Sequence, residues 1–295
     1  MSMRAQFVKT VEGLLAADER LFVLLGDIGV WGFRNAFNLF SGRVYNIGVV
    51  EQSTVSLASG LAMEGFIPVV HTIAPFLVER SIEQLKDDFC YQGLGGNFVS
   101  VGASYDYAAL GCTHHCPADV GILKNLPGME IVLPGTAIEF DLLFRASYAN
   151  NNPSYFRLSE RENPESFAVG FGRAEVVKKG KLATVVAVGP MLAPVLEAAG
   201  NLDVTILYYT TVKPFDAQTL NRSCIADKIL LVEPYYQGGL ANEIIESLPK
   251  KQIILKCLGV PFKFLTHYGK AEEHDEEIGL TAINIRQQLK ELINE

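Results

Sequence analysis

Cysteine is sparse in this chain, which argues against a protein held together by disulfide bonds. The chain has 295 residues and five cysteines. An odd and sparse set is unlike a disulfide framework and indicates reduced thiols. The histidines His114 and His115 lie between Cys112 and Cys116, but zinc sites draw ligand pairs from two separated segments, and we find no second such pair. We therefore expect no metal site.

A surplus of positive charge is also missing. Lysine and arginine total 25 against 33 aspartates and glutamates, which gives a formal net charge of −8 and a pI near 5.3. Nucleic acids and anionic membranes are bound through a concentrated basic face. The composition therefore argues against nucleic-acid and membrane-surface partners.

Long hydrophobic runs are absent as well. The longest uncharged run, Leu182 to Leu196, contains Gly189, Pro190 and Pro194, so it predicts a strand, a turn and a helix rather than a membrane span. The N-terminal twenty residues contain three acids and no export-signal pattern. The expected location is the cytoplasm.

Apolar runs of strand length alternate with segments of helical period, which is typical of a mainly parallel sheet covered by helices. We predict an α/β protein with two three-layer α/β/α domains, 1–165 and 166–295, because a charged, proline-containing stretch at 157–172 interrupts the pattern. The predicted strands are 21–27, 43–49, 67–72, 97–102, 129–134, 182–189, 203–209, 228–234 and 252–260. The predicted helices are 3–18, 51–63, 76–90, 117–125, 136–149 and one near 280–294.

Glu51 is the most informative single residue. It follows an apolar strand and begins a helix that soon becomes almost wholly apolar. A partly desolvated carboxylate in such a place can share a proton with a ring nitrogen of a bound heterocycle. An acid in a first helical turn is also stabilised by unpaired backbone N–H groups, and for Glu51 taken alone this second interpretation is favoured.

The sequence around Glu51 favours the first interpretation, in which its carboxylate meets a bound heterocycle. The segment VYNIGVVEQSTVSLASGLAMEGFIPVVHTIAPFLVERSIEQLKDD (44–88) contains Gly-x-x-Glu-Gln at a strand end, a Gly-Leu-Ala helix, an aromatic followed by Arg, and an acid-Gln pair. It resembles the pyrimidine-binding domain of the transketolase family, which includes 1-deoxyxylulose-5-phosphate synthases and 2-oxo acid dehydrogenase β subunits. The likeness continues through GCTHH, LPGMEIVLPG and NPSYFRL. Further on, VKPFD, EPYYQGGLANEI and GVPFKF resemble the family's C-terminal domain, so almost the whole chain is covered.

The resemblance implies thiamine diphosphate as cofactor. The family's matching glutamate bonds the aminopyrimidine ring, so Glu51 is expected to relay the proton that activates the cofactor. Phe76 matches an aromatic on which that ring stacks, and Ile73 stands at a position that is often aromatic. His114 matches a histidine that reaches the substrate's reacting oxygen, and His115 matches the Thr-His-His of deoxyxylulose-phosphate synthases. The alternatives are a core phenylalanine at 76 and a loop histidine at 115.

Three departures from the family pattern concern the substrate. Leu110 replaces an aspartate that orients a donor hydroxyl, and a leucine side chain cannot accept that hydrogen bond. Ala118 replaces a glutamate of many transketolases. Glu160 stands where an arginine would face a sugar phosphate, and its carboxylate would repel that group unless Arg157 or Arg161 substitutes.

The family's diphosphate-binding motif, Gly-Asp-Gly followed by Asn about thirty residues later, is missing; it holds Mg²⁺ against the phosphates. LGDIG (25–29) has only the Gly-Asp, so Asp27 is expected to be structural. The resemblance therefore implies a C-terminal (β-like) subunit of a split enzyme, which self-associates to a dimer and needs a separate diphosphate- and Mg²⁺-binding subunit. Ketol transfer between sugars is favoured. A deoxyxylulose-phosphate-synthase-like condensation, a 2-oxo acid decarboxylase and a non-catalytic scaffold remain alternatives.

Overall fold

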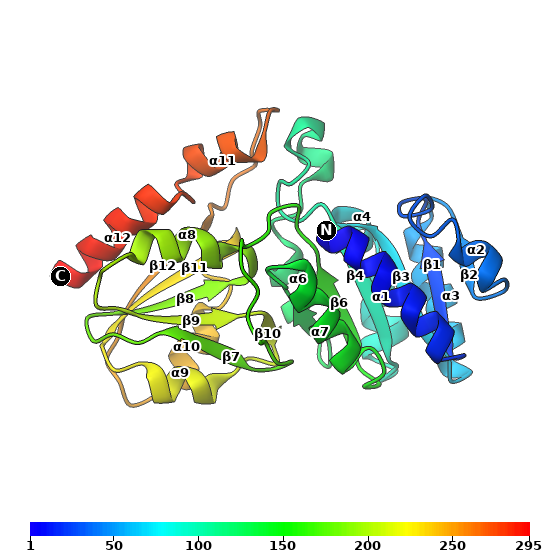
Figure 1. The fold of residues 1–295 in the computed structure, drawn as a ribbon, viewed down its shortest axis with the longest axis horizontal. Helices are drawn as coiled ribbons and strands as arrows, with labels where there is room; N and C mark the ends of the chain where they lie inside the picture. The colour runs from blue at the N-terminus through cyan, green and yellow to red at the C-terminus, as the bar shows by residue number, and fades with distance from the viewer.

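The computed structural model describes residues 1–295, and strands and helices alternate along it (Figure 1). The strands are β1 (Leu21–Leu25), β2 (Val44–Asn46), β3 (Ile67–Ile73), β4 (Gly96–Val101), β5 (Glu130–Val132), β6 (Pro153–Arg157), β7 (Ala174–Lys178), β8 (Thr184–Val188), β9 (Thr205–Tyr209), β10 (Thr211–Lys213), β11 (Lys228–Tyr236) and β12 (Ile254–Val260). The helices are α1 (Met3–Ala17), α2 (Ala36–Leu39), α3 (Glu51–Met63), α4 (Ala74–Leu77), α5 (Ile82–Gln84), α6 (Asp119–Lys124), α7 (Ala137–Ser147), α8 (Leu192–Ala199), α9 (Ala217–Ser223), α10 (Ala241–Ser247), α11 (Ala271–Ile278) and α12 (Ala282–Asn294). Shorter or irregular helical turns are η1 (Leu85–Cys90), η2 (Ala108–Leu110), η3 (Cys112–His114) and η4 (Gly189–Met191).

The strands form two sheets. A seven-stranded sheet has the order β10-β5-β6-β4-β3-β1-β2, and a five-stranded sheet has the order β12-β11-β8-β9-β7. Neighbouring strands are parallel except at one edge of each sheet, where β10 runs antiparallel to β5 and β7 antiparallel to β9. The predicted pair of mainly parallel α/β sheets is confirmed.

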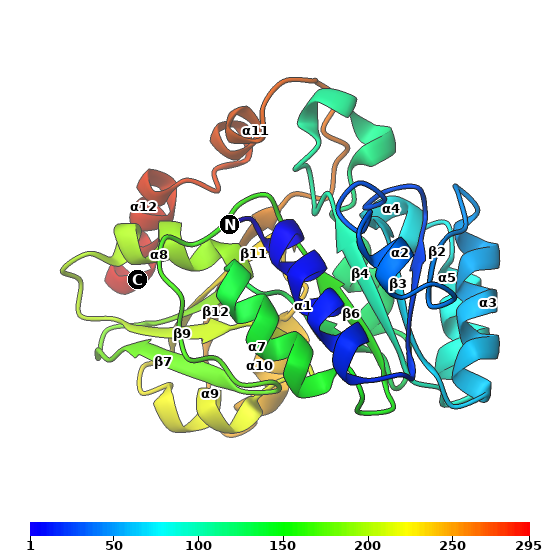
Figure 2. The ribbon, with the colours of Figure 1, turned by 45° about the vertical axis from the view of Figure 1, so that its right-hand side comes forward.

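Helices cover both faces of each sheet, because side chains of a strand alternate between its two faces. In β1, Val23 and Leu25 belong to one core with α1 and α7, whereas Leu24 belongs to another with α3 and α6. The first core, of 40 buried residues, continues into the second sheet beneath α8 and α12; the second, of 30, continues beneath α9 and α10. Figure 2 shows α1 and α7 side by side on one face of the first sheet. None of the helices combines the length and the hydropathy that a membrane span requires.

Strand β10 connects the two halves of the chain. After entering the second sheet at β7, the chain returns to pair β10 with the edge of the first sheet. The Lys213 ammonium then donates to the carbonyls of Lys124 and Leu126, at and just beyond the C-terminal end of α6, at 2.8 and 2.6 Å. A lysine at a helix C-terminus satisfies carbonyls that the helix leaves unpaired. The domain boundary after residue 165 stays a prediction.

The predicted helix at 76–90 is wrong as a continuous element. The chain forms α4, α5 and η1 there, and an irregular turn separates α4 from α5. The Ser81 hydroxyl donates to the Phe76 carbonyl at 3.2 Å, and the Arg80 amide bonds the Pro75 carbonyl five residues back. Such serine bonds compete with the regular helical ladder. The turn places the Arg80 side chain beside α3.

His71, on β3, is fully buried against Phe7, with ring centroids 4.7 Å apart. Its Nδ1 bonds the Val99 carbonyl at 2.8 Å, and its Nε2 has no partner. Burial lowers the pKa of His71 to about 4, because the imidazolium form loses its hydration.

Because His71 is buried in its neutral form, we expect the folding stability of the protein to fall in acid. An unfolded histidine titrates near pH 6.5, so as the pH falls from about 6.5 to about 4 the unfolded state binds the extra proton and folding stability drops. At about pH 5 the linkage relation gives a loss of about 2 kcal/mol relative to about pH 8. Denaturant unfolding of the wild type and His71→Leu at both pH values measures this. The wild type should lose about 2 kcal/mol more than the variant; equal losses would contradict the prediction.

Candidate active site

Glu51 lies where the carboxyl ends of β1, β2 and β3 meet the first turn of α3, and this edge of a parallel sheet is where α/β proteins bind ligands. Its side chain is 1% exposed. The Thr72 hydroxyl donates to one carboxylate oxygen at 3.0 Å, and the Arg80 guanidinium donates to the other at 2.5 Å. Gly26, just after β1, permits this packing, because a Cβ there would lie 3.0 Å from Thr72 and 3.5 Å from Glu51.

Three further side chains extend from Glu51 in a continuous row. The Arg80 guanidinium lies over the Phe76 ring, 4.2 Å from its centroid. The His114 ring meets Phe76 edge to face at 5.3 Å, and the hydroxyl of Thr113 lies 2.9 Å from His114 Nδ1. Glu51, Arg80, Phe76 and His114, here called the Glu51–His114 row, thus combine an acid, a cation, an aromatic ring and an imidazole. The structure brings three of the predicted site residues together and adds Arg80, which the sequence shows only as part of a family motif.

The remaining predicted site residues lie around this row rather than in it. Ile73 ends β3 and is buried in the core shared with α1 and α7. His115 is buried and faces α11, where its ring lies 5.6 Å from that of His274. Burial and the neighbouring His274 lower the pKa of His115. His114 therefore faces Phe76 of α4, whereas the next residue, His115, faces α11.

Arg157 and Arg161 are both held in ion pairs. Arg157, at the end of β6, is 1% exposed and donates to Asp119 at 2.6 Å and to the Ser104 hydroxyl at 2.7 Å. A ligand cannot reach it in this conformation, so substrate contact stays a prediction that requires the pair to open. Arg161 is partly exposed and pairs with Asp275 of α11. It lines the same cavity as the half-exposed Leu110.

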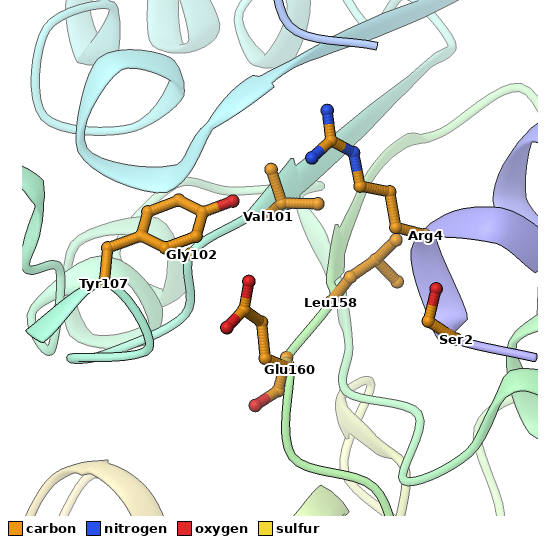
Figure 3. Close-up of a pocket in the computed structure, with 8 residues that line it drawn as sticks. Ser2, Arg4, Val101, Gly102, Tyr107, Leu158 and Glu160 are labelled. Atoms are coloured by element: carbon orange, nitrogen blue, oxygen red, sulfur yellow. The ribbon is translucent and has the colours of Figure 1, made fainter. Parts of the chain in front are cut away.

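Glu160 lines this cavity as well, and it also lines a second one, of about 360 Å³, between the start of α1 and the carboxyl ends of β4 and β6. Figure 3 shows its carboxylate and the Tyr107 hydroxyl on one side of this cavity and the Arg4 guanidinium on the other. Arg4 and Tyr107 are separated from Glu160 in the sequence, so no local pattern indicated them. Ala118 lies at a third cavity, beside Tyr236.

A solved structure shares the fold of the whole chain. The whole chain superposes on 98% of a chain described as "Split gene transketolase, inactive beta4 tetramer", with a TM-score of 0.86 and 26% sequence identity. The shared fold is that of two consecutive α/β domains of the transketolase type.

Family models give the narrower assignment. Residues 1–165 match the transketolase pyrimidine binding domain, and residues 172–285 match the transketolase C-terminal domain. The chain belongs to the transketolase family.

Its relatives include chains of similar and of greater length. A 33.6 kDa protein in the fasciation locus of Rhodococcoides fascians is 39% identical over 95% of this chain and 91% of its own length. A 1-deoxy-D-xylulose-5-phosphate synthase of Magnetococcus marinus is 32% identical over 86% of this chain but only 43% of its own length. One subunit of the apulose-4-phosphate transketolase of Actinobacillus succinogenes is 29% identical over 75% of both chains. The chain thus spans less than half of the synthase that it matches.

Proposed function

We propose that this chain is the C-terminal, β-like subunit of a split thiamine-diphosphate-dependent transketolase, which transfers a two-carbon ketol unit between sugars. The observation that carries the proposal is the Glu51–His114 row, which unites the acid, the aromatic ring and the histidine expected for such a site. The similarity to the apulose-4-phosphate transketolase subunit, whose own length is largely covered, supports a separately encoded chain.

The residues present fit the cofactor's pyrimidine end. Glu51 accepts only two hydrogen bonds, whereas an ionised carboxylate offers about four lone-pair positions, so it can accept another donor. The Phe76 ring is partly exposed. A heterocycle stacking on its Arg80 side would displace the guanidinium that now lies 4.2 Å from the ring centroid.

When bound, thiamine diphosphate supplies a thiazolium ring that takes up the electron pair released at the substrate carbon. Glu51 would hold and return a proton at its free carboxylate position, while Thr72 fixes its orientation. His114 has Nδ1 beside Thr113, which leaves Nε2 to donate to the substrate oxygen.

The diphosphate and Mg²⁺ are assigned to a partner subunit. Asp27, in the lone Gly-Asp of LGDIG, is bonded through its backbone and side chain to Asn46, at 3.0 and 3.1 Å. Apolar side chains are left exposed on β2, in the turn before Glu51 and along α3; they are Tyr45, Val49, Val50, Leu57 and Met63. Exposed apolar surface of this kind indicates a protein partner. It supports docking of the partner, self-association to a dimer, or both.

A deoxyxylulose-phosphate-synthase-like condensation is the second candidate. The 32% identity to such a synthase and the consecutive histidines His114 and His115 favour it. Leu110, half exposed at a cavity wall, offers no acceptor for a donor hydroxyl, which also weakens assignment of an ordinary ketose donor. Comparing sugar and 2-oxo acid donors in the reconstituted enzyme separates these reactions from a 2-oxo acid decarboxylase.

Reconstitution tests the proposal. We expect this chain, mixed with a partner chain that carries Gly-Asp-Gly, to bind thiamine diphosphate in the presence of Mg²⁺, as measured by quenching of aromatic fluorescence, while neither chain binds it alone. Phe76→Ala should weaken binding at least about fivefold, because an aromatic stacking contact contributes on the order of 1 kcal/mol beyond area burial. The matched control is Phe264→Ala, at a ring that is 74% exposed on the second half of the chain. A mixture that binds no cofactor would favour a scaffold.

A further inference from the structure

Three potential metal ligands, His267, His274 and Glu277, lie together at α11. One ligating atom of each residue lies within 4.8 Å of those of the other two. His274 and Glu277 are three residues apart on the helix, which places them on one face. His267, in the segment before the helix, bonds Glu277 through Nε2 at 2.8 Å and stacks on His274 with ring centroids 5.2 Å apart.

His274 gives an independent indication of a ligand. Its side chain is buried, with 1% of the residue exposed, yet neither ring nitrogen has a hydrogen-bond partner. Buried polar atoms in native proteins almost always have a partner, so an imidazole with two unpaired nitrogens requires an explanation. The neighbouring rings of Tyr105 and His115 lie 5.4 and 5.6 Å away and bond neither nitrogen. The Nε2 atom of His115 is itself buried without a partner.

We propose that His267, His274 and Glu277 bind one divalent transition-metal ion of the zinc class. Two imidazole nitrogens and one carboxylate oxygen form a known zinc set that leaves a fourth position open. Imidazole also selects zinc, cobalt or nickel over Mg²⁺ and Ca²⁺, which prefer oxygen ligands throughout. His115 is the one further imidazole in contact with this set, and it or water fills the fourth position.

The surroundings of Glu277 suit this role. One carboxylate oxygen accepts from Lys263 at 2.9 Å, and the other faces His267. The ion would replace the His267–Glu277 hydrogen bond, while Lys263 keeps the first oxygen and so fixes the carboxylate's orientation. Such outer contacts orient metal ligands and tune their affinity.

The site would join two parts of the molecule. Figures 1 and 2 both show the segment before α11 beside the excursion that holds η2 and η3, and Tyr268 lies against Gly111 there. That excursion carries His114. A bound ion would therefore fix the α11 segment next to the Glu51–His114 row. This inference does not rest on the proposed activity, and it departs from the sequence-based expectation of no metal, because the fold brings His267, which lies outside α11, onto His274 and Glu277.

The test is metal binding by the full chain after removal of metals with a chelator. Calorimetric titration with ZnCl₂ should show one ion per chain. Co²⁺ should give visible d–d absorption without a thiolate charge-transfer band, since no cysteine belongs to the site. His267→Gln and Glu277→Gln change partly exposed side chains and so should leave the fold intact, as circular dichroism checks. Each of these substitutions removes one metal ligand and should weaken zinc binding at least about tenfold. Even substitution of a residue that only orients a ligand reaches a loss of that size.

Cys112→Ser provides the matched control, because Cys112 is an exposed thiol beside His114 and is the obvious competing metal ligand. Zinc binding by this variant should equal that of the wild type. The inference is overturned if the chain binds no zinc, if binding survives both the His267→Gln and the Glu277→Gln substitution, or if cobalt shows a thiolate band that Cys112→Ser abolishes.

Discussion

Replacing Glu51 by alanine should abolish cofactor activation in the reconstituted enzyme while the assembly stays intact. Glu51 is 1% exposed, and it is the only acid that contacts both Arg80 and Thr72. Positioned proton transfer contributes about 10² to 10⁴ in rate, so we expect a loss of at least about a hundredfold. The measurement is exchange of the thiazolium C2 proton into deuterated water, followed by NMR, which needs no knowledge of the substrate.

The isosteric variant Glu51→Gln separates proton transfer from packing. Glutamine keeps the shape, and its amide oxygen can still accept from Arg80 while its NH2 group faces the Thr72 hydroxyl, which can accept; but glutamine cannot carry the proton. It should therefore match Glu51→Ala in exchange rate while retaining wild-type oligomeric size and thermal stability. Exchange at the wild-type rate in either variant would show that residue 51 is not the relay and would remove the basis of the proposed function.

Much of the fold could be predicted because its central strands are uniformly apolar. β8, β9 and most of β11 are buried on both faces, so their sequences read as continuous hydrophobic runs. Edge elements carry no such signal. β7 includes Glu175 and Lys178 and pairs only on one side, and β10 is three residues long and exists through its pairing with β5. β6 begins with Pro153, which weakens a strand assignment even though the strand is central.

Some features of the candidate site could be predicted from the local sequence, and others arise only from the tertiary fold. Glu51 could be located from its place between a strand and a helix. Its contact with Arg80 could not, because the two are 29 residues apart and meet only through an irregular turn after α4. His267 and His274 are close in the sequence, but the stacking of their rings is seen only in the fold. Spacing along a chain indicates which chemistry is available, whereas pairing of buried charges depends on the sheet order.

Removing one partner of the buried ion pair between Asp119 and Arg157 should cause a large loss of stability. Both side chains are 0–1% exposed and 38 residues apart, and their contact is 2.6 Å long. Asp119 also accepts from the Tyr155 hydroxyl at 2.9 Å, so its removal leaves the buried Arg157 guanidinium without a counter-charge and takes one hydrogen-bond partner from the Tyr155 hydroxyl. Breaking such a pair costs about 3–5 kcal/mol, and we expect that loss for Asp119→Ala in chemical denaturation.

The double variant Asp119→Leu/Arg157→Met shows whether the cost arises from the uncompensated charge. Replacing a whole buried pair by apolar groups of similar volume is often close to neutral, so this variant should be about 2 kcal/mol or more better than Asp119→Ala. The single variant Arg157→Met decides the role of Arg157. If the guanidinium served the substrate instead, Arg157→Met would raise the KM of the reconstituted enzyme and leave the free energy of unfolding unchanged. A buried structural pair predicts the reverse, because the 1% of the side chain that is exposed leaves no surface for a phosphate to contact.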